Sequence, residues 1–209
     1  GIEGFLAGNV IDLAAESQKT IRALRRTPSS ALGSSRHKVK EPDLPVILRR
    51  LGEFDIRTLF MVGGNDTMDT INRVTSYAAG EGYELCGVGI PKTVDNDLYG
   101  TDHTPGYPSA ARYVALSVLE AGVLARDMQK VDQFVIYQSI GRDAGWLSAA
   151  AALVKRDEAD APHLIYMPER AFDREKFLSD VEAAHKEHGF VSIVCGEGLK
   201  YADGTAGSA

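Results

Sequence analysis

Four short polar segments of the sequence carry residue types that can bind anions and move protons. Glycine lets the backbone approach a bulky anion, and arginine pairs with phosphate oxygens. Aspartate accepts a proton or binds a divalent cation. These groups suit phosphoryl transfer, in which the protein mainly positions two oxygens in line and neutralises charge. The segments are residues 63–67, 91–97, 139–145 and 196–198.

The first segment, Gly63-Gly64-Asn65-Asp66-Thr67, can form a phosphate seat where a strand turns into a helix. Gly63 and Gly64 leave the backbone open, and Thr67 can cap the helix whose N-terminus would face the anion. A plain strand-to-helix turn is the alternative, and this short motif alone favours it. Asp66 repels phosphate unless a divalent cation or a lysine lies between them.

The second segment contains Asp95 and Asp97 on either side of Asn96. Alternate side chains of an extended stretch point to one side, so the two carboxylates can face a shared metal or a substrate hydroxyl. One of them can act as a general base. An Asx turn that satisfies its own backbone is the alternative.

Two arginines can reach a phosphoryl group. Arg142 lies in a glycine-flanked turn before an alanine-rich segment, where helix N–H groups add further donors. A surface arginine paired with Asp143 is the alternative. Arg36 lies in a loop rich in serine and basic residues, and a solvated basic loop is its alternative.

The elements that must position these residues follow an α/β pattern. From Arg57 onward, short β-prone runs alternate with segments of helical period, which predicts parallel strands joined by crossover helices. Ligands of such sheets bind at the carboxyl ends of the strands. Strands are predicted at 58–62, 85–90, 133–138, 163–167 and 191–195, and helices at 10–16, 44–51, 67–79, 109–130, 144–154 and after an N-cap at Asp173, with a polar loop at 27–40.

Composition excludes several classes of function. The chain has 209 residues, enough for one large domain or two small ones. A net charge of −6 argues against a nucleic-acid or anionic membrane surface. Its apolar stretches are broken before the ~20 residues of a membrane span, and no secretory signal is visible. Cys86 and Cys195 lack metal-ligand spacing, which predicts two buried thiols in strands and fits a cytoplasmic protein.

Together with Gly100-Thr101-Asp102, and in this order, the four segments resemble the 6-phosphofructokinase family. The resemblance extends from about residue 32 to 199, and Pro91-Lys92-Thr93-Val94-Asp95-Asn96-Asp97 is its most specific part. It implies a Rossmann-like α/β fold with parallel sheets, with a cleft between a donor-binding domain at 1–106 and a sugar-binding domain at 107–209, each incomplete. It also implies a homo-oligomer, dimer or tetramer, that uses Mg²⁺ to phosphorylate the 1-hydroxyl of fructose 6-phosphate in glycolysis.

The resemblance assigns roles to individual residues. Asp95 matches the catalytic base, Thr93 its neighbour at the transferred phosphate, and Arg142 the arginine that stabilises the transferring group. The sugar phosphate would bind at Thr93, Asp95, Ile140, Gly141, Arg142 and Glu197. The donor would bind at Arg36, Gly63, Gly64, Asp66, Thr67 and Lys92, and Mg²⁺ at Asp66 and Asp97.

Two positions favour diphosphate over ATP as the donor. Members of the family that use ATP typically have glycine where this sequence has Asp66 and Lys92. A carboxylate adds bulk and negative charge where the inner phosphate of a nucleotide would lie. Lys92 can pair with a diphosphate oxygen instead.

Several departures from the family pattern leave alternatives open. Asn65 replaces a metal-binding aspartate, Gln133 replaces an arginine that reaches the sugar phosphate, and 137–140 lack the usual Glu-x-Met stretch. A different phosphorylated sugar, or a regulatory subunit without turnover, is therefore an alternative. An NAD-kinase-like enzyme shares only the Gly-Gly-x-x-Thr pattern. Neither the first strand with its phosphate loop nor the later basic segment has a counterpart, so we expect a fragment.

Overall fold

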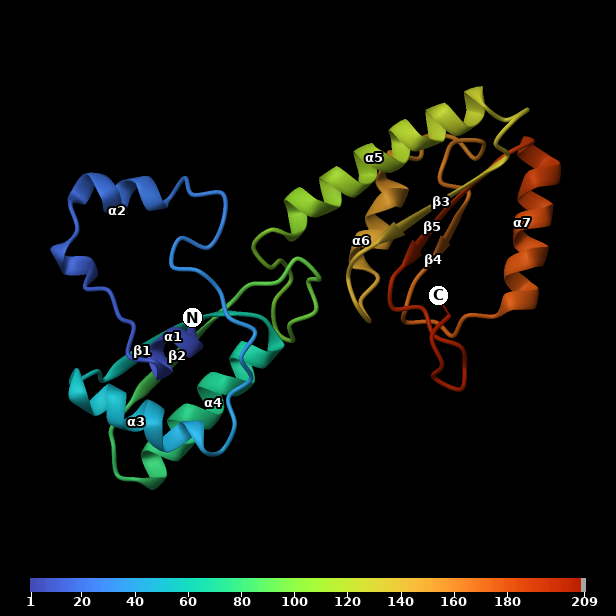
Figure 1. Ribbon diagram of the computed structural model, residues 1–209. Coiled ribbons are helices and arrows are strands. Elements are labelled where there is room, and N and C mark those ends of the chain that lie inside the picture. Colours follow the sequence, from blue (N-terminus) through green and yellow to red (C-terminus); the bar gives the residue numbers. More distant parts are fainter. Residues whose placement is uncertain (208–209) are drawn as a thin grey trace. The chain divides into compact units, whose positions relative to one another are not determined.

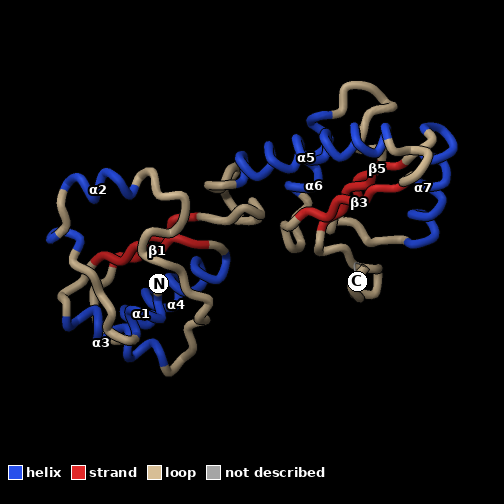
Figure 2. Tube along the Cα trace, turned by 45° about the horizontal axis from the view of Figure 1, so that its top comes forward, coloured by secondary structure: helices blue, strands red, loops and turns tan. Residues whose placement is uncertain are grey.

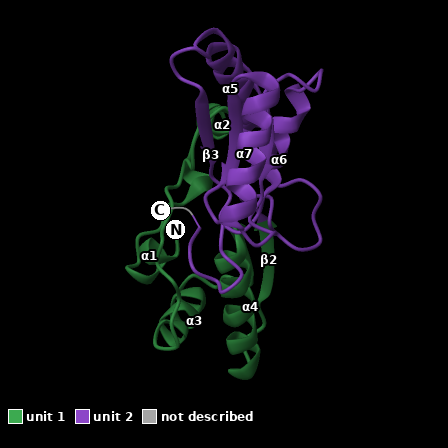
Figure 3. Ribbon diagram, turned by 90° about the vertical axis from the view of Figure 1, so that its right-hand side faces the viewer, with its two compact units in different colours: residues 1–90 green, residues 91–209 purple. Residues whose placement is uncertain are grey.

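The computed structural model describes residues 1–207 and divides into two compact units. Unit 1 comprises Gly1–Ile90 and unit 2 comprises Pro91–Ala209 (Figure 3). Among the described residues, no helix combines the length and the apolar character needed to cross a membrane.

Unit 1 is a strand pair covered on one face by helices (Figure 1). Leu59 of β1 packs against a core in which Ile47 and Leu51 are fully buried. On the other face of β1, Phe60 and Val62 are each 62% exposed. The elements are α1 (Ile2–Leu6), η1 (Leu13–Ala15), α2 (Gln18–Leu24), α3 (Asp43–Glu53), β1 (Thr58–Gly63), α4 (Asn65–Gly80) and β2 (Cys86–Pro91), with β1 paired to β2.

Unit 2 is built on a parallel three-stranded sheet of order β3-β5-β4. Figure 2 shows β3 and β5 side by side, with α5 and α7 alongside. Ile193 of β5 lies opposite Ile136 of β3 and Leu164 of β4, which makes β5 the buried central strand. The elements are α5 (Tyr107–Asp127), β3 (Phe134–Ser139), α6 (Trp146–Ala150), η2 (Ala151–Val154), β4 (Leu164–Tyr166), α7 (Arg174–His188) and β5 (Val191–Gly196).

The α/β class and all five strands are confirmed, with each bound shifted by at most one residue. The helix predicted at 10–16 is wrong, because only Leu13–Ala15 form a short 3₁₀ turn. The helix predicted at 144–154 is α-helical only over Trp146–Ala150. Helices α1 and α2 were not predicted; they are short, and none of their residues is buried.

Two local expectations are corrected by the structure. Helix α4 begins at Asn65 with Gly64 as its N-cap, so Thr67 lies inside the first turn and does not cap the helix. Cys86 is exposed in β2, whereas Cys195 is partly buried in β5. Burial raises the pKa of the Cys195 thiol, which keeps it protonated and unreactive.

The division between the units lies between Ile90 and Pro91, before the boundary predicted at Gly106. The reason is packing. Val94 contacts the core cluster that contains Ala111 of α5 and Leu147 of α6, so the loop after β2 belongs to unit 2. The assignment of one unit to the donor and the other to the sugar stays a prediction.

Candidate active site

The loop that carries Asp95 is fixed by its own polar side chains. Asn96 has a left-handed backbone with φ of 57° and is 6% exposed. Its amide accepts a hydrogen bond from the backbone N–H of Thr104 at 2.9 Å and donates one to the carbonyl of Asp102 at 3.0 Å. The hydroxyl of Thr104, which is 1% exposed, donates to the carbonyl of Thr93. These hydrogen bonds tie residues 93–104 together in one closed loop.

Asp95, near the start of this loop, lies beside Arg142. The Nε atom of Arg142 is 3.9 Å from Oδ2 of Asp95, whose side chain is only 14% exposed, whereas that of Arg142 is 73% exposed. The Thr93 hydroxyl accepts a hydrogen bond from the backbone N–H of Asp95 at 3.3 Å. The structure therefore brings together a sheltered carboxylate, a hydroxyl and an accessible guanidinium.

The turn that carries Arg142 is held by the segment after β5. The Oε1 atom of Glu197 accepts hydrogen bonds from the backbone N–H groups of Gly141, at 3.0 Å, and Arg142, at 2.9 Å. Arg142 has a φ of 52°, a left-handed conformation that is costly for a residue with a side chain. A Cβ atom at Gly198 would lie 1.9 Å from the carbonyl oxygen of Arg142, so only glycine allows this close approach.

The residues on either side of Arg142 make further contacts. Asp143, the alternative partner of Arg142, instead pairs with Lys200 at 2.6 Å. Ile140 is 56% exposed directly after β3. The Glu169 carboxylate accepts a hydrogen bond from the N–H of Gly145, the N-cap of α6, at 2.7 Å.

Sequence reasoning missed the supporting roles of Asn96, Thr104, Glu169 and Lys200. Only Asn96 carried a signal, because asparagine tolerates the left-handed conformation.

In unit 1 the glycine segment forms the turn from β1 into α4. A Cβ atom at Gly63 would lie 2.0 Å from the hydroxyl oxygen of Thr67, so glycine is required for this packing. Asp66 lies in the first turn of α4, and its Oδ1 atom is 3.4 Å from Nζ of Lys38. A lysine therefore lies beside the carboxylate that would repel phosphate. Arg36 is exposed in unit 1, and Lys92 is exposed in unit 2.

The predicted Mg²⁺ ligands are not gathered into a metal cage. Within residues 1–207, no three His, Cys, Asp or Glu side chains form a group that could hold an ion. Asp66 belongs to unit 1 and Asp97 to unit 2. Mg²⁺ commonly binds one or two carboxylates and completes its coordination with phosphate oxygens and water. The roles of Asp66 and Asp97 as Mg²⁺ ligands stay predictions.

The comparison with protein families decides the class of this chain. The model of the family described as phosphofructokinase matches residues 1–208. The chain belongs to the phosphofructokinase family. This agrees with the order and spacing of the four polar segments.

Relatives and solved structures extend the match. A pyrophosphate–fructose 6-phosphate 1-phosphotransferase from Halomonas elongata is 41% identical and covers 98% of this chain and 50% of the relative. A sulfofructose kinase from Alkalicoccus urumqiensis is 38% identical over 95% of this chain and 52% of the relative. The crystal structure of a pyrophosphate-dependent phosphofructokinase from Nitrosospira multiformis matches with a TM-score of 0.88 and 38% identity, covering 98% of this chain and 52% of that one. The chain spans about half the length of these relatives.

Proposed function

We propose that the protein carrying this chain transfers a phosphoryl group from diphosphate to the 1-hydroxyl of fructose 6-phosphate. The products are fructose 1,6-bisphosphate and inorganic phosphate. The observation that carries this proposal is the placement of the sheltered Asp95 carboxylate 3.9 Å from the accessible guanidinium of Arg142, within turns fixed by hydrogen bonds.

The proposed roles follow from charge and position. Asp95 accepts the proton of the attacking sugar hydroxyl, and its fixed loop keeps the acceptor oxygen in place. Arg142 extends into solvent, where its fork can pair with oxygens of the transferring group as negative charge develops there. Thr93 lies beside Asp95 and supplies a hydroxyl to the same group. Ile140 and Gly141 are proposed to bind the sugar phosphate, and Glu197 is proposed to hold the turn that carries them.

The choice of diphosphate is supported by two charged positions and by the names of the relatives. Asp66 and Lys92 replace the glycines of ATP users, and the relative from Halomonas elongata is named for pyrophosphate. Arg36, Gly63, Gly64 and Thr67 are the remaining proposed donor residues. Bound Mg²⁺ would neutralise phosphate charge, with Asp66 and Asp97 as its candidate protein ligands.

A second candidate acceptor is sulfofructose, because one relative is named a sulfofructose kinase and Gln133 departs from the family pattern at the sugar phosphate. A regulatory subunit without turnover also stays an alternative, although Asp95 and Arg142 are both in place. The NAD-kinase-like alternative is excluded by membership of the phosphofructokinase family. The predicted homo-oligomer stays a prediction.

Replacing Asp95 with Asn tests the proposal in the full-length protein. The variant keeps the shape of the side chain but cannot accept the proton, so kcat should fall by roughly 10²–10⁴, with little change in the KM values. Asp132→Asn removes an exposed carboxylate outside the proposed site and is the matched control. Product formation from diphosphate or ATP, with fructose 6-phosphate or sulfofructose, identifies the donor and acceptor. Near-normal turnover in Asp95→Asn would contradict the assignment of the base.

A further inference from the structure

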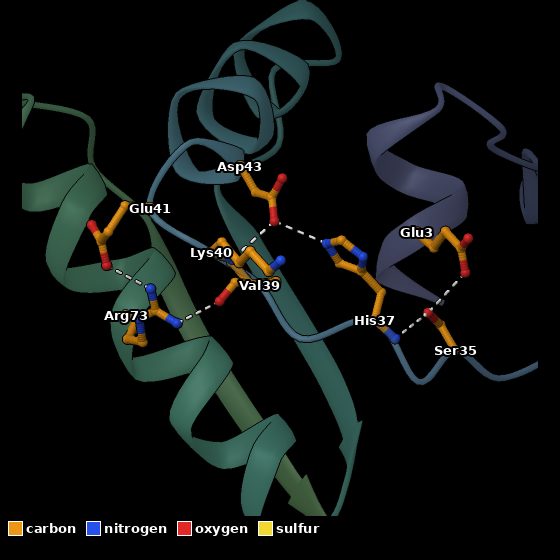
Figure 4. Close-up of polar contacts among 8 residues, drawn as sticks. All are labelled: Glu3, Ser35, His37, Val39, Lys40, Glu41, Asp43 and Arg73. Atoms are coloured by element: carbon orange, nitrogen blue, oxygen red, sulfur yellow. Dashed lines mark hydrogen bonds and ion pairs between the residues drawn. The ribbon is translucent and has the colours of Figure 1, made fainter.

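The segment from Ser35 to Lys40 is basic and is attached to the core of unit 1. Ser35 donates a hydrogen bond from its hydroxyl to Glu3 at 3.3 Å, and Val39 is 4% exposed in the core of unit 1 (Figure 4). Arg36 and Lys38 are exposed, as is His37 between them. The segment is therefore anchored on the side of Ser35 and Val39 and carries exposed basic side chains.

The anchored side is held at several points along the segment. His37 Nε2 lies 2.9 Å from Oδ2 of Asp43, and that same oxygen accepts a hydrogen bond from the N–H of Lys40 at 2.9 Å. Arg73 of α4 donates to the carbonyl of Val39 at 2.5 Å and to the Glu41 carboxylate at 2.5 Å (Figure 4). These contacts fix the backbone of the segment against α3 and α4.

Lys38 is the basic residue that this arrangement places at the start of α4. Its Nζ atom lies 3.4 Å from Oδ1 of Asp66, while the two side chains remain 76% and 68% exposed. Both charges are therefore close to each other and open to a ligand. Asp66 is one of the residues that we propose to favour diphosphate, so its cation partner belongs to the same site.

We infer that Lys38 is a donor-binding residue: it offsets the negative charge of Asp66 and supplies an ammonium group to the oxygens of diphosphate. The inference rests on the proposed function. Diphosphate is a compact and highly charged anion, and a carboxylate beside it is tolerated only with a nearby cation. Lys38 meets that need from the protein itself, in addition to the metal ion that accompanies the donor.

The test compares Lys38→Gln with Lys40→Gln in the full-length protein. Both variants remove one ammonium group from an exposed position of the same segment, but only Lys38 pairs with Asp66. We expect Lys38→Gln to raise the KM for diphosphate about tenfold, the usual scale for a lost charged hydrogen bond. The KM for the sugar phosphate should change less than twofold. Lys38→Arg should restore most of the affinity, and Lys40→Gln should behave as the unmodified protein.

Each other outcome has a defined meaning. An unchanged KM for diphosphate in Lys38→Gln would overturn the inference and leave the proposed function intact. An equal rise of the KM for diphosphate in Lys38→Gln and Lys40→Gln would indicate a nonspecific electrostatic effect of the basic segment. That result would also overturn the inference. Failure of the unmodified protein to use diphosphate would instead overturn the proposed function. Circular dichroism of each variant checks that the fold is kept.

Discussion

Glu197 should act mainly by holding the turn that carries Arg142, and Glu197→Gln tests this. Its carboxylate accepts two backbone hydrogen bonds, at 3.0 and 2.9 Å, from Gly141 and Arg142. A hydrogen bond to a charged group contributes about 1.5–3 kcal/mol and a neutral one about 0.5–1.5. Glutamine keeps an acceptor oxygen but loses the charge, which costs about 1–2 kcal/mol for the pair after allowance for solvent.

That loss is comparable with the strain of the turn. The left-handed backbone of Arg142, with φ of 52°, costs about 1–2 kcal/mol by itself. The weakened turn should therefore occupy its productive geometry for only a small fraction of the time. A shift of 1–2 kcal/mol corresponds to a roughly 5–30-fold fall in kcat. The KM for the sugar phosphate should change little.

The assay is steady-state kinetics of Glu197→Gln, Arg142→Ala and the double variant in the full-length protein. If Glu197 acts through Arg142, the double variant should be no slower than Arg142→Ala alone, because the two residues work as a unit. A raised KM for the sugar phosphate with unchanged kcat would refute this reasoning and make Glu197 a direct sugar contact. Fully additive losses in the double variant would refute it as well.

Two further predictions concern stability. The pKa of His163 is lowered, chiefly by burial, and its Nδ1 accepts a hydrogen bond from the N–H of Ser192 that protonation would break. The unfolded chain therefore binds more protons than the folded chain. The midpoint of urea unfolding should fall as the pH drops through about 6.5 towards the lower pKa of His163 in the folded state. His163→Gln should remove this part of the pH dependence. Gly122→Ala should lower the melting temperature, because the new Cβ would lie 2.3 Å from the Cβ of Ala161. Gly80→Ala meets open space, so its free energy of unfolding should rise by up to about 1 kcal/mol. Opposite signs would refute the packing argument.

The strands could be predicted because their signals are local. Short apolar runs closed by glycine or polar residues mark β1 to β5, and ligand-bearing turns follow such strands. Asp95 and Arg142 each follow a predicted strand, but β2 and β3 belong to different sheets. The packing of Val94 against α5 and α6 is what places Asp95 in the same unit as Arg142. The roles of the site residues and the binding of Mg²⁺ stay predictions.

Other features depend on contacts between distant parts of the chain. No local pattern links Glu197 to Gly141, and none links Arg73 to the carbonyl of Val39. The unit boundary differs from the predicted one because Val94 packs against α5 and α6, a contact that no local pattern indicates. The start of α4 was also misplaced, because its N-cap is Gly64, which has no side chain that could signal a cap.

The close approach of Gly198 to Arg142 has a consequence for mutational tolerance. The space left for a side chain at Gly198 is nil, because the carbonyl oxygen of Arg142 already fills it. Gly198 has no side chain that could take part in the reaction, yet it should tolerate as few substitutions as Arg142. In a saturation library selected for growth on the proposed activity, codon 198 should be depleted of every non-glycine variant alongside codon 142.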